Sequence, residues 1–368
     1  MVRARGPVSE VVRVGLVGYG DVGRIHALCW KSLPFYYPGE DWRVEVVAVA
    51  TSREESAAAA ARDIGTSLWT TDVDELVAHP EVDLVDCMTP DDTHAAVSIA
   101  ALRAGKHVYC EKPIARTVDE ARAMLDAARK SGAVNAVAFP VRFAPAVLRA
   151  RRLVDDGLLG RPISFRTSLL HSGYVDPTRP MSWRLDADRA AGGALFDLGA
   201  HNVDLIRYLV GEFASVTARV ETVVPERPAS PGSEETRPVE VDDLSIALAE
   251  LEGGAVGTLE FSRVATGITE GPLLEVHGTE GAFRLNGLRP NRIEVFERGR
   301  DEGFREVVVP ERWPRLGFVP LQYEVAQAVV QGRPAAVTFE DGYRAQVVLE
   351  AIREAGQKRS WVDVPAME

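Results

Sequence analysis

The chain has 368 residues and a formal net charge of −12, with a composition typical of globular proteins. Its length suits two domains better than one, and its negative charge argues against nucleic acids and anionic membrane surfaces as partners. No apolar run is long enough to span a bilayer, and residues 1–10, which lack the apolar segment of a signal peptide, are expected to form a loose tail.

The cysteines and histidines predict neither disulfides nor a metal site. Cys29, Cys87 and Cys110 are widely spaced and form no CxxC pair, which indicates a reducing, cytoplasmic location. The seven histidines have neither HxxxH nor HExxH spacing, so no dedicated zinc site is expected.

The first predicted elements are a strand, a glycine loop and a helix. Residues 11–17 are rich in β-branched side chains, as in the strands of parallel sheets, and residues 25–30 continue as a helix. Between them lies a GxGxxG motif, whose glycines allow a tight turn, close approach of a pyrophosphate and helix–strand packing. We therefore expect a dinucleotide-binding loop, with a purely structural glycine turn as the alternative. The loop consists of Gly18, Tyr19, Gly20, Asp21, Val22 and Gly23.

The end of the second predicted strand, 43–50, indicates which nicotinamide cofactor is bound. A dinucleotide fold usually places an acid here, where it binds the ribose 2′-hydroxyl. The chain instead has Thr51, Ser52 and Arg53. Hydroxyls and a guanidinium suit a 2′-phosphate, so we predict that NADP(H) is favoured over NAD(H). If one of the two following glutamates reaches back to the ribose, the cofactor is NAD(H).

Strands and helices continue to alternate up to residue 139, after a loop at 33–41 that is rich in proline and aromatic residues. This alternation is typical of a doubly wound parallel sheet, so we predict an α/β Rossmann domain over residues 11–139. The further strands are expected at 69–70, 82–88, 107–110 and 133–139, and the further helices at 55–64, 95–104 and 117–130.

The pattern changes after residue 140. Glycine-containing turns at 252–255 and 278–281 join strands of period two, which predicts a large, mostly antiparallel open sheet in a second α/β domain over 140–368. Residues 225–239 are rich in Pro, Ser, Glu and Arg and are expected to form a mobile surface loop. The predicted strands are 163–171, 215–224, 244–252, 255–263, 273–278, 282–285, 292–297, 304–309 and 361–364, and the helices are 146–156, 318–331 and 341–354.

The richest candidate site in this second half follows the pair Gly192-Gly193, at the start of a predicted helix running to about residue 210. Asp197, His201 and Asp204 stand at i, i+4 and i+7, so their side chains share one helical stripe. A carboxylate one turn from an imidazole can fix its tautomer and raise its basicity, as a general base requires. The alternative is a surface salt bridge on an amphipathic helix. A metal at these three residues is not expected, because nothing nearby completes a coordination sphere.

Together with the glycine loop, these motifs resemble the glucose–fructose oxidoreductase / inositol dehydrogenase / MocA family of oxidoreductases, and the resemblance covers nearly the whole chain. The resemblance rests on the order and spacing of several motifs together, because no single motif is specific enough to identify the family. The motifs are Gly18-x-Gly20-x-x-Gly23, Pro90 with His94, Ala104-Gly105-Lys106-His107-Val108, Glu111-Lys112-Pro113, Arg142-Phe143-x-Pro145, Trp183-Arg184 and Gly192-Gly193-x-x-x-Asp197-x-Gly199-x-His201-x-x-Asp204.

The resemblance implies roles for individual residues. Lys112, Asp197 and His201 match the catalytic positions of the family, although a surface lysine is the alternative for Lys112. The expected cofactor contacts beyond the glycine loop are Thr89, Pro90, His94, Glu111 and Lys112. The expected substrate contacts are Lys112, Arg142, Tyr174, Trp183, Arg184, Asp197, His201 and Asp204. Asn202 stands where many polyol-specific members carry an acid, which weakens the prediction of inositol as the substrate.

The leading functional hypothesis is hydride transfer between a nicotinamide cofactor and a secondary alcohol or ketone of a sugar, polyol or related small molecule. In this hypothesis His201, oriented by Asp197, exchanges the hydroxyl proton, and Lys112 stabilises the developing alkoxide. The alternatives are a nicotinamide-dependent glycosidase of the same fold and a non-catalytic sugar or cofactor sensor. A homodimer or homotetramer is expected, built on the outer face of the second sheet. This face is expected to carry alternating residues such as Ala247, Ala249, Leu251 and Leu259.

Overall fold

A computed structural model describes residues 10–268, 271, 273–310 and 317–366. The chain forms two compact units, of which the first comprises Met1–Pro140 and Trp313–Tyr343 and the second Val141–Arg312 and Arg344–Glu368. The division at residue 140 lies beside the sequence-derived boundary. The prediction assigned Trp313–Tyr343 to the second domain. This stretch instead belongs to the first unit, because its helix packs against elements of that unit. The predicted tail lies outside the described residues, apart from Glu10, which begins the first strand.

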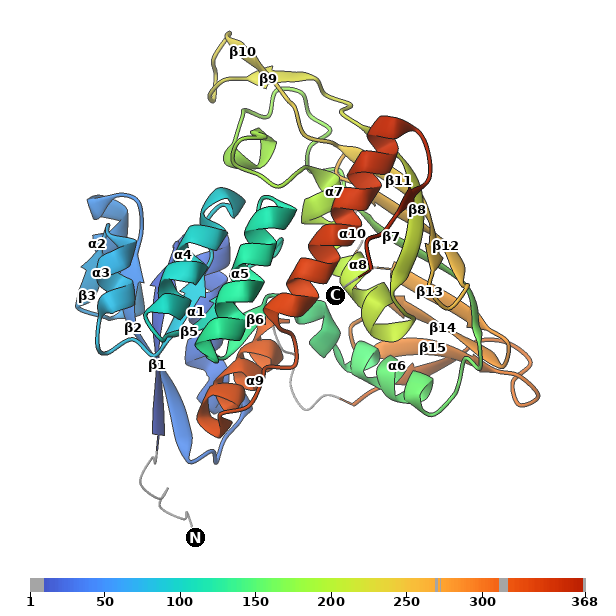
Figure 1. Ribbon diagram of the computed structural model, residues 1–368, viewed down its shortest axis with the longest axis horizontal. Helices are drawn as coiled ribbons and strands as arrows, with labels where there is room; N and C mark the ends of the chain where they lie inside the picture. Colours follow the sequence, from blue (N-terminus) through green and yellow to red (C-terminus); the bar gives the residue numbers. More distant parts are fainter. Residues whose placement is uncertain (1–9, 269–270, 272, 311–316, 367–368) are drawn as a thin grey trace. The chain divides into compact units, whose positions relative to one another are not determined.

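The first unit is built on a six-stranded sheet in the order β3-β2-β1-β4-β5-β6, in which all neighbouring strands are parallel (Figure 1). The predicted doubly wound Rossmann sheet is therefore confirmed. The order reverses between β1 and β4, the point at which open α/β sheets bind ligands beyond the carboxyl ends of their strands. The strands are β1 (Glu10–Val17), β2 (Trp42–Ala50), β3 (Leu68–Thr70), β4 (Leu84–Cys87), β5 (His107–Cys110) and β6 (Asn135–Val137).

The helices of the first unit are α1 (Asp21–Tyr36), α2 (Glu54–Ile64), α3 (Val73–Ala78), α4 (Asp91–Arg103), α5 (Val118–Ser131) and α9 (Phe318–Gln331). Helix α5 begins with a capping box between Thr117 and Glu120 and ends at Gly132 in the left-handed conformation. Helix α1 runs into the predicted loop and contains Pro34. The helix persists there because Leu33 is buried, and Tyr37 just beyond it stacks on Tyr323 of α9 with ring centroids 3.6 Å apart.

The second unit contains a nine-stranded sheet in the order β16-β15-β14-β13-β7-β12-β11-β8-β17. Its neighbouring strands are antiparallel except β7 and β12, so the predicted large, mostly antiparallel sheet is confirmed. The strands are β7 (Pro162–Leu170), β8 (Phe213–Glu221), β11 (Leu244–Leu251), β12 (Val256–Ser262), β13 (Leu273–Gly278), β14 (Gly281–Asn286), β15 (Arg292–Glu297), β16 (Arg305–Val308) and β17 (Val362–Asp363).

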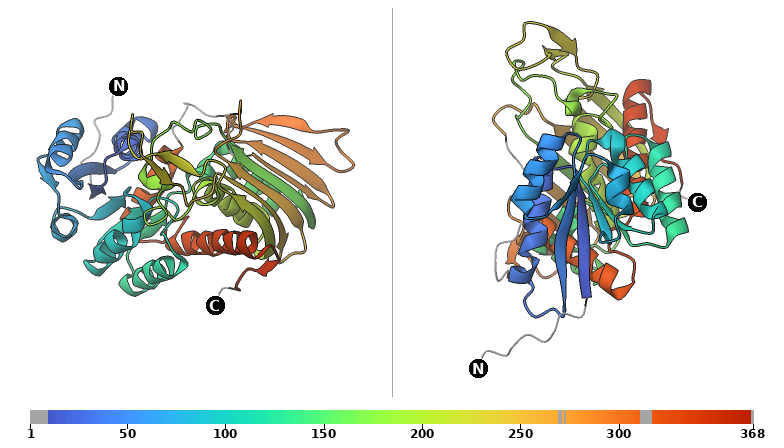
Figure 2. Two further views of the ribbon diagram at one scale, coloured as in Figure 1. Left: turned by 90° about the horizontal axis from the view of Figure 1, so that it is seen from above. Right: turned by 90° about the vertical axis from the view of Figure 1, so that its left-hand side faces the viewer.

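Helices cover one face of this sheet and leave the other face open, as Figure 2 shows. Gly199 of α8 lies so close to the sheet that a Cβ there would approach the Phe261 ring to 2.9 Å. Gly356 of α10 approaches Val220 in the same way, at 2.7 Å. The helices of this unit are α6 (Pro145–Asp155), α7 (Ala194–Asp197), α8 (Gly199–Leu209) and the part of α10 (Phe339–Lys358) that follows Tyr343.

The alternation along β11 corrects the expected outer face. Ala247, Ala249 and Leu251 are buried beneath the helices, together with Leu259 of β12. The open face instead carries the intervening side chains of β11, which are largely exposed. The sequence correctly predicted that side chains alternate between the two faces of β11. It assigned these residues to the wrong face, because an alanine or a leucine does not by itself indicate which face of a sheet it occupies.

Residues 225–239, expected to form a mobile loop, contain the two-stranded sheet of β9 (Glu226–Pro228) and β10 (Thr236–Pro238). The Arg227 side chain is fully buried and donates hydrogen bonds to the carbonyl oxygens of Tyr174 at 2.6 Å and Asp176 at 2.8 Å. A polar composition did not reveal this buried guanidinium. In the part of the chain that the structure describes, the helices all lack the combination of length and apolar character needed to cross a membrane.

Candidate active site

The glycine loop joins β1 to α1. Gly18 has φ +94°, and a Cβ there would lie 2.7 Å from the Met88 carbonyl oxygen, so this position needs glycine. A Cβ at Gly23 would lie 2.7 Å from the carbonyl oxygen of Gly18. At Gly20, by contrast, a Cβ would meet none of the described atoms within 4 Å. Gly20 is also the N-cap of α1 and has no side chain with which to cap the first amides. Open space before uncapped helical N–H groups fits the pyrophosphate of a nicotinamide dinucleotide.

At the end of β2, the hydroxyl of Thr51 takes part in a local turn. Its Oγ1 donates to the carbonyl oxygen of Arg53 at 3.0 Å and lies 2.6 Å from the Oγ of Ser56. Ser52 and Arg53 are exposed. Thr51 therefore shapes the turn, and Arg53 is the residue of the predicted 2′-phosphate site that presents a positive charge to solvent.

His94 was expected to contact the cofactor, but its ring is almost completely buried. Its Nδ1 and Nε2 lie 2.9 Å from the carbonyl oxygens of Pro113 and Thr89. Burial lowers the pKa of His94, but the neighbouring Cys87 and the two carbonyls outweigh it and raise the pKa above its ordinary value. His94 therefore joins the loops after β4 and β5, and both of its ring nitrogens face backbone carbonyl oxygens.

The same histidine belongs to a cluster with the geometry of a small metal site. The ligand atoms of Cys87, His94 and Cys110 lie within 4.8 Å of one another, and all three residues are buried. Cys87 and Cys110 are brought together by the parallel pairing of β4 with β5. Both ring nitrogens of His94 already face carbonyl oxygens, so strand pairing and loop anchoring account for the cluster.

Lys112 follows β5, at the edge of the sheet where such folds bind ligands, and is partly exposed. The preceding Glu111 is buried and points inward: its Oε2 accepts the Lys112 N–H at 3.0 Å, and its Oε1 lies 3.0 Å from the Nε2 of His26. The sequence did not identify His26 or its second partner, Asp86. The available signal was Asp86 itself, a carboxylate within an otherwise apolar, fully buried strand, where a charge must be paired.

The acid–base candidates of the second unit stand at a helix junction. The predicted helix is interrupted at Leu198, so Asp197 ends α7 and His201 lies in the first turn of α8. Both side chains are partly exposed. The interruption allows α8 to begin at Gly199, whose missing side chain lets the helix approach the sheet closely. The expected one-turn spacing is kept, and the structure adds a break between the two residues.

Asp242 anchors the start of α7. Its carboxylate accepts the backbone N–H groups of Gly193 at 2.9 Å and Leu195 at 2.7 Å, as a capping side chain does. A Cβ at Gly193 would lie 1.7 Å from the carbonyl oxygen of Asp242. Burial raises the pKa of Asp242, and the two amide hydrogen bonds oppose this shift. Gly193 therefore accommodates the close approach of the segment that precedes β11, and Asp242 is a positioning residue that the sequence did not reveal.

Arg142 and Asp204, which were both expected to bind substrate, form an ion pair with each other. Arg142 Nε donates to Asp204 Oδ2 at 2.7 Å, and Nη2 donates to Oδ1 at 2.5 Å. Both side chains are buried, and the guanidinium also lies 4.8 Å from the centre of the Tyr208 ring. A bidentate buried pair of this kind holds α8 in place. Asp204 shares the stripe with His201, but it faces the interior.

The remaining substrate candidates divide into packed and accessible groups. Tyr174 is buried, with the guanidiniums of Arg179 and Arg263 lying 4.0 and 4.6 Å from its ring centre. Trp183 and Arg184 stack on each other at 4.4 Å and stay partly exposed. The structure thus leaves Trp183 and Arg184 as candidates for substrate contact and makes Tyr174 a packing residue.

His171, at the end of β7, is a site residue to which the sequence gave no role of its own. Burial lowers its pKa, against the opposing influence of Asp197. Its Nδ1 accepts the backbone N–H of Gly173 at 3.0 Å, so the neutral ring carries its proton on Nε2. A partly exposed imidazole in this form is a hydrogen-bond donor within the electrostatic reach of Asp197.

Comparison with known proteins identifies both halves of the chain. A model of the oxidoreductase family with an NAD-binding Rossmann fold matches residues 12–139, and a model of the GFO/IDH/MocA C-terminal domain matches residues 147–284. Levoglucosan dehydrogenase of Pseudarthrobacter phenanthrenivorans is 36% identical over 96% of this chain and 98% of its own. The scyllo-inositol 2-dehydrogenase (NAD(+)) of Bacillus subtilis is 28% identical, with 91% of each chain covered.

A solved structure agrees with these relatives. Levoglucosan dehydrogenase in complex with NADH and levoglucosan matches with a TM-score of 0.91 and 36% identity, over 97% of this chain and 100% of the other. The glycine loop and the Asp197–His201 motif thus lie in the two domains of an established architecture. The chain belongs to the GFO/IDH/MocA family of oxidoreductases, with an NAD-binding Rossmann domain followed by the family's C-terminal domain.

Proposed function

We propose that this oxidoreductase interconverts a secondary alcohol and a ketone on a sugar or polyol, using a nicotinamide cofactor. The observation that carries the proposal is the partly exposed pair Asp197 and His201, positioned by Asp242, in a chain whose first domain has an NAD-binding fold. The resemblance of the chain to named sugar and inositol dehydrogenases supports the substrate class.

The proposed chemistry assigns a separate task to each side chain. A bound nicotinamide supplies the redox chemistry. His201 takes the hydroxyl proton during oxidation and returns it during reduction, and Asp197 stabilises the charged ring. Lys112, one of only five lysines in the chain, supplies positive charge to the same oxygen as its negative charge develops. His171, with its proton on Nε2, donates a hydrogen bond to a neighbouring hydroxyl of the substrate.

Levoglucosan is the first substrate to test. The relative that is 36% identical over nearly the full length carries this name, whereas the inositol dehydrogenase is 28% identical. Asn202 further weakens the case for inositol, because its side chain is fully buried and donates to Thr167 Oγ1 at 2.5 Å. Trp183 and Arg184 are proposed to contact the sugar ring and its hydroxyls.

For the cofactor, we propose a preference for NADP(H). The support is Arg53, an exposed guanidinium at the N-terminus of α2, at the strand end where an acid would repel a 2′-phosphate. The solved relative contains NADH, so NAD(H) is the competing cofactor. Titration of both reduced cofactors decides between them.

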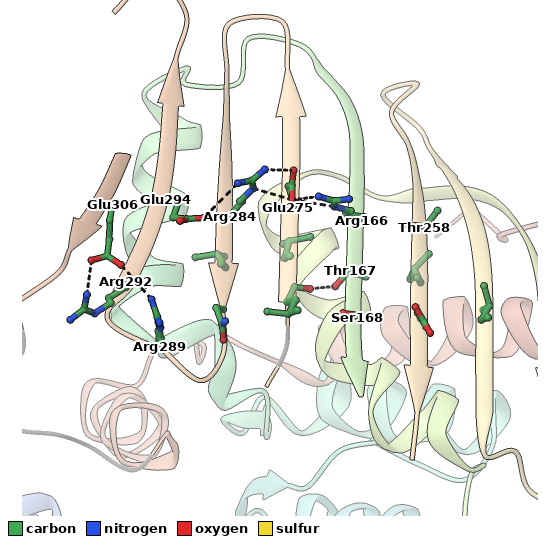
Figure 3. Close-up of a pocket in the computed structure, with 17 residues that line it drawn as sticks. Arg166, Thr167, Ser168, Thr258, Glu275, Arg284, Arg289, Arg292, Glu294 and Glu306 are labelled. Atoms are coloured by element: carbon green, nitrogen blue, oxygen red, sulfur yellow. Dashed lines mark hydrogen bonds and ion pairs between the residues drawn. The ribbon is translucent and has the colours of Figure 1, made fainter. Parts of the chain in front are cut away.

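We also propose self-association through the open face of the nine-stranded sheet. Ile246, Leu248 and Val256 are 47%, 50% and 50% exposed on this face. Beside them, a hollow of about 640 Å³ is lined by alternating arginines and glutamates, among them Arg166 and Glu275 (Figure 3). A second copy of this chain suits such a surface, because apolar strips and alternating charges on a two-fold interface can complement themselves.

This assembly is tested by sedimentation of the wild type and of Leu248→Glu. The wild type should sediment as a dimer or tetramer of the 40.0 kDa chain, and the variant should dissociate. Thr217→Ser, on β8, is a matched control within the sheet. A wild type that sediments only as a 40.0 kDa species at micromolar concentration would contradict the proposal.

The proposed compartment is the cytoplasm. Cys29, Cys87 and Cys110 are all free thiols, and Cys87 faces Cys110 across neighbouring strands without forming a disulfide. Free thiols in this arrangement are typical of proteins in a reducing compartment.

The function itself is tested with a panel of levoglucosan, inositols, aldoses and their keto forms, combined with NAD(H) and NADP(H). Absorbance of the reduced cofactor should change with at least one sugar. A glycosidase of this fold would instead release sugar with no net redox change and would retain its cofactor. A sensor would bind sugar or cofactor without turnover, and either result would replace the proposed reaction.

A further inference from the structure

The first unit contains a buried charge network in which Glu111, an expected cofactor contact, is joined to two residues with no expected role, His26 and Asp86. His26 of α1 is fully buried, with Nδ1 at 3.0 and 3.1 Å from the two carboxylate oxygens of Asp86 and Nε2 at 3.0 Å from Oε1 of Glu111. Ionised carboxylates only accept hydrogen bonds, so both ring nitrogens must donate. With both carboxylates ionised, this geometry is that of an imidazolium between two carboxylates.

The electrostatics agree with this geometry. Burial alone lowers the pKa of His26, but Asp86 and Glu111 together raise it to about 10. The titratable groups that face the ring are Asp86 on β4 and Tyr109 and Glu111 on and after β5, while α9 contributes Phe318, which does not titrate. The raised pKa favours the protonated form of His26 at neutral pH.

The ring is held on all sides. It stacks on Tyr109 with centroids 5.2 Å apart and an interplanar angle of 16°, and Phe318 of α9 lies 4.6 Å away. Asp86 also accepts the Trp30 Nε1 hydrogen at 2.7 Å. Contacts from several elements thus fix the position of the imidazolium independently of its hydrogen bond to Glu111.

Glu111 links the imidazolium to the backbone of Lys112. One of its carboxylate oxygens binds His26, and the other accepts the backbone N–H of Lys112 at 3.0 Å. Because each oxygen has its own partner, the carboxylate cannot rotate without breaking a charge-assisted hydrogen bond. Removing the imidazolium would take away the hydrogen-bond donor that Glu111 and Asp86 share.

We propose that His26 is a positioning residue for Lys112, acting through Glu111 to fix the backbone from which the lysine side chain projects. The proposal rests on the role of Lys112 in the proposed function, but the link from His26 to Glu111 to the Lys112 amide is a separate claim. Misplacement of a catalytic group by about 1 Å can reduce the rate roughly 100-fold, so such a link is large enough to matter.

The test compares His26→Gln with Trp30→Phe. Both variants remove a donor to Asp86, but only the first removes the cation and the contact with Glu111. Two quantities are measured: kcat on the best substrate, and the hydrogen-exchange rate of the Lys112 amide in cofactor-free protein. His26→Gln should accelerate exchange at least 10-fold and lower kcat about 10- to 100-fold. Trp30→Phe should leave both near the wild-type values at a temperature where it is folded.

The two readouts separate the possible failures. If His26→Gln folds and keeps slow Lys112 exchange and wild-type kcat, the positioning role is refuted. Faster exchange with unchanged kcat would support the link from His26 to the Lys112 backbone and would contradict the proposed role of Lys112 in the reaction, which Lys112→Ala then tests alone. If His26→Gln does not fold, Glu111→Gln takes its place, because it leaves the pairing of His26 with Asp86 intact. Unchanged Lys112 exchange in Glu111→Gln would overturn the proposal, and faster exchange would support it.

Discussion

The two units hold their reactive candidates in different ways. In the first, the buried side chain of His26 is hydrogen-bonded to Glu111, which in turn accepts the backbone N–H of Lys112. In the second, the buried ion pair between Arg142 and Asp204 lies one helical turn from His201. Losing a buried partner should therefore impair both chemistry and stability in the first unit, but mainly stability in the second. The predictions below test this difference.

The largest effect is expected for Lys112→Ala. The lysine is proposed to act on the charge that develops in the transition state, so kcat should fall by on the order of 10²–10⁴. The free energy of unfolding should change little, because the side chain is partly exposed. Steady-state kinetics and urea unfolding check both values, with Lys130→Ala as the control. A fall in stability that matches the loss of activity would remove the lysine from the mechanism.

Arg142→Ala should show the opposite pattern. It leaves the buried Asp204 carboxylate unpaired, which typically costs about 3–5 kcal/mol of unfolding free energy. The kcat of the folded fraction should stay near that of the wild type. Chemical denaturation measures the loss, and the double variant Arg142→Met/Asp204→Leu should lose less than the single variant. A drop in kcat with no loss of stability would instead indicate that Arg142 contacts the substrate.

The pH dependence of stability isolates the network of the first unit. The pKa of His26 is raised from 6.5 to about 10 in the folded protein. Its contribution to stability is therefore complete below pH 6.5 and is lost as the pH rises towards 10. The difference in unfolding free energy between the wild type and His26→Gln should shrink by on the order of 3–4 kcal/mol between pH 6.5 and 9.5. Urea unfolding at both values measures it, and a constant difference would contradict the doubly bonded imidazolium.

The smallest effect is expected at the cofactor. Arg53→Ala should weaken NADP(H) binding by about 1.5–3 kcal/mol, the usual contribution of a charged hydrogen bond, and leave NAD(H) binding nearly unchanged. Fluorescence titration of the reduced cofactors checks this, with Arg62→Ala, on the same helix, as the control. Equal losses for both cofactors would show that Arg53 does not read the 2′-phosphate.

The sequence predicted the architecture because its signals are local. The glycine loop between a strand and a helix, the regular alternation up to residue 139 and the period-two strands after it each follow from neighbouring residues. The candidate side chains Lys112, Asp197 and His201 stand in recognisable motifs for the same reason. The buried face of β11 was predicted wrongly, because helices that are distant in the sequence decide which face of the strand they cover.

The anchors of the site could not be predicted in this way. His26 meets Glu111 across 85 residues, and Arg142 meets Asp204 across 62. Neither pairing leaves a spacing in the sequence that points to its partner. Asp204 looked accessible because it shares a helical stripe with His201, and only the tertiary contact with Arg142 shows that it faces inward. A charged residue at an apolar position, such as Asp86, is the one local sign of such a network.

The most direct test of the proposed function is the turnover of His201→Asn on the best sugar found, measured together with cofactor affinity and unfolding free energy. The account predicts a fall in kcat on the order of 10²–10⁴, with cofactor affinity and stability close to those of the wild type. Asp197→Asn should be severely impaired as well, because the imidazole would lose its charged partner. Wild-type turnover in His201→Asn would contradict the assigned base, and His171, which is partly exposed, would then be the next residue to test.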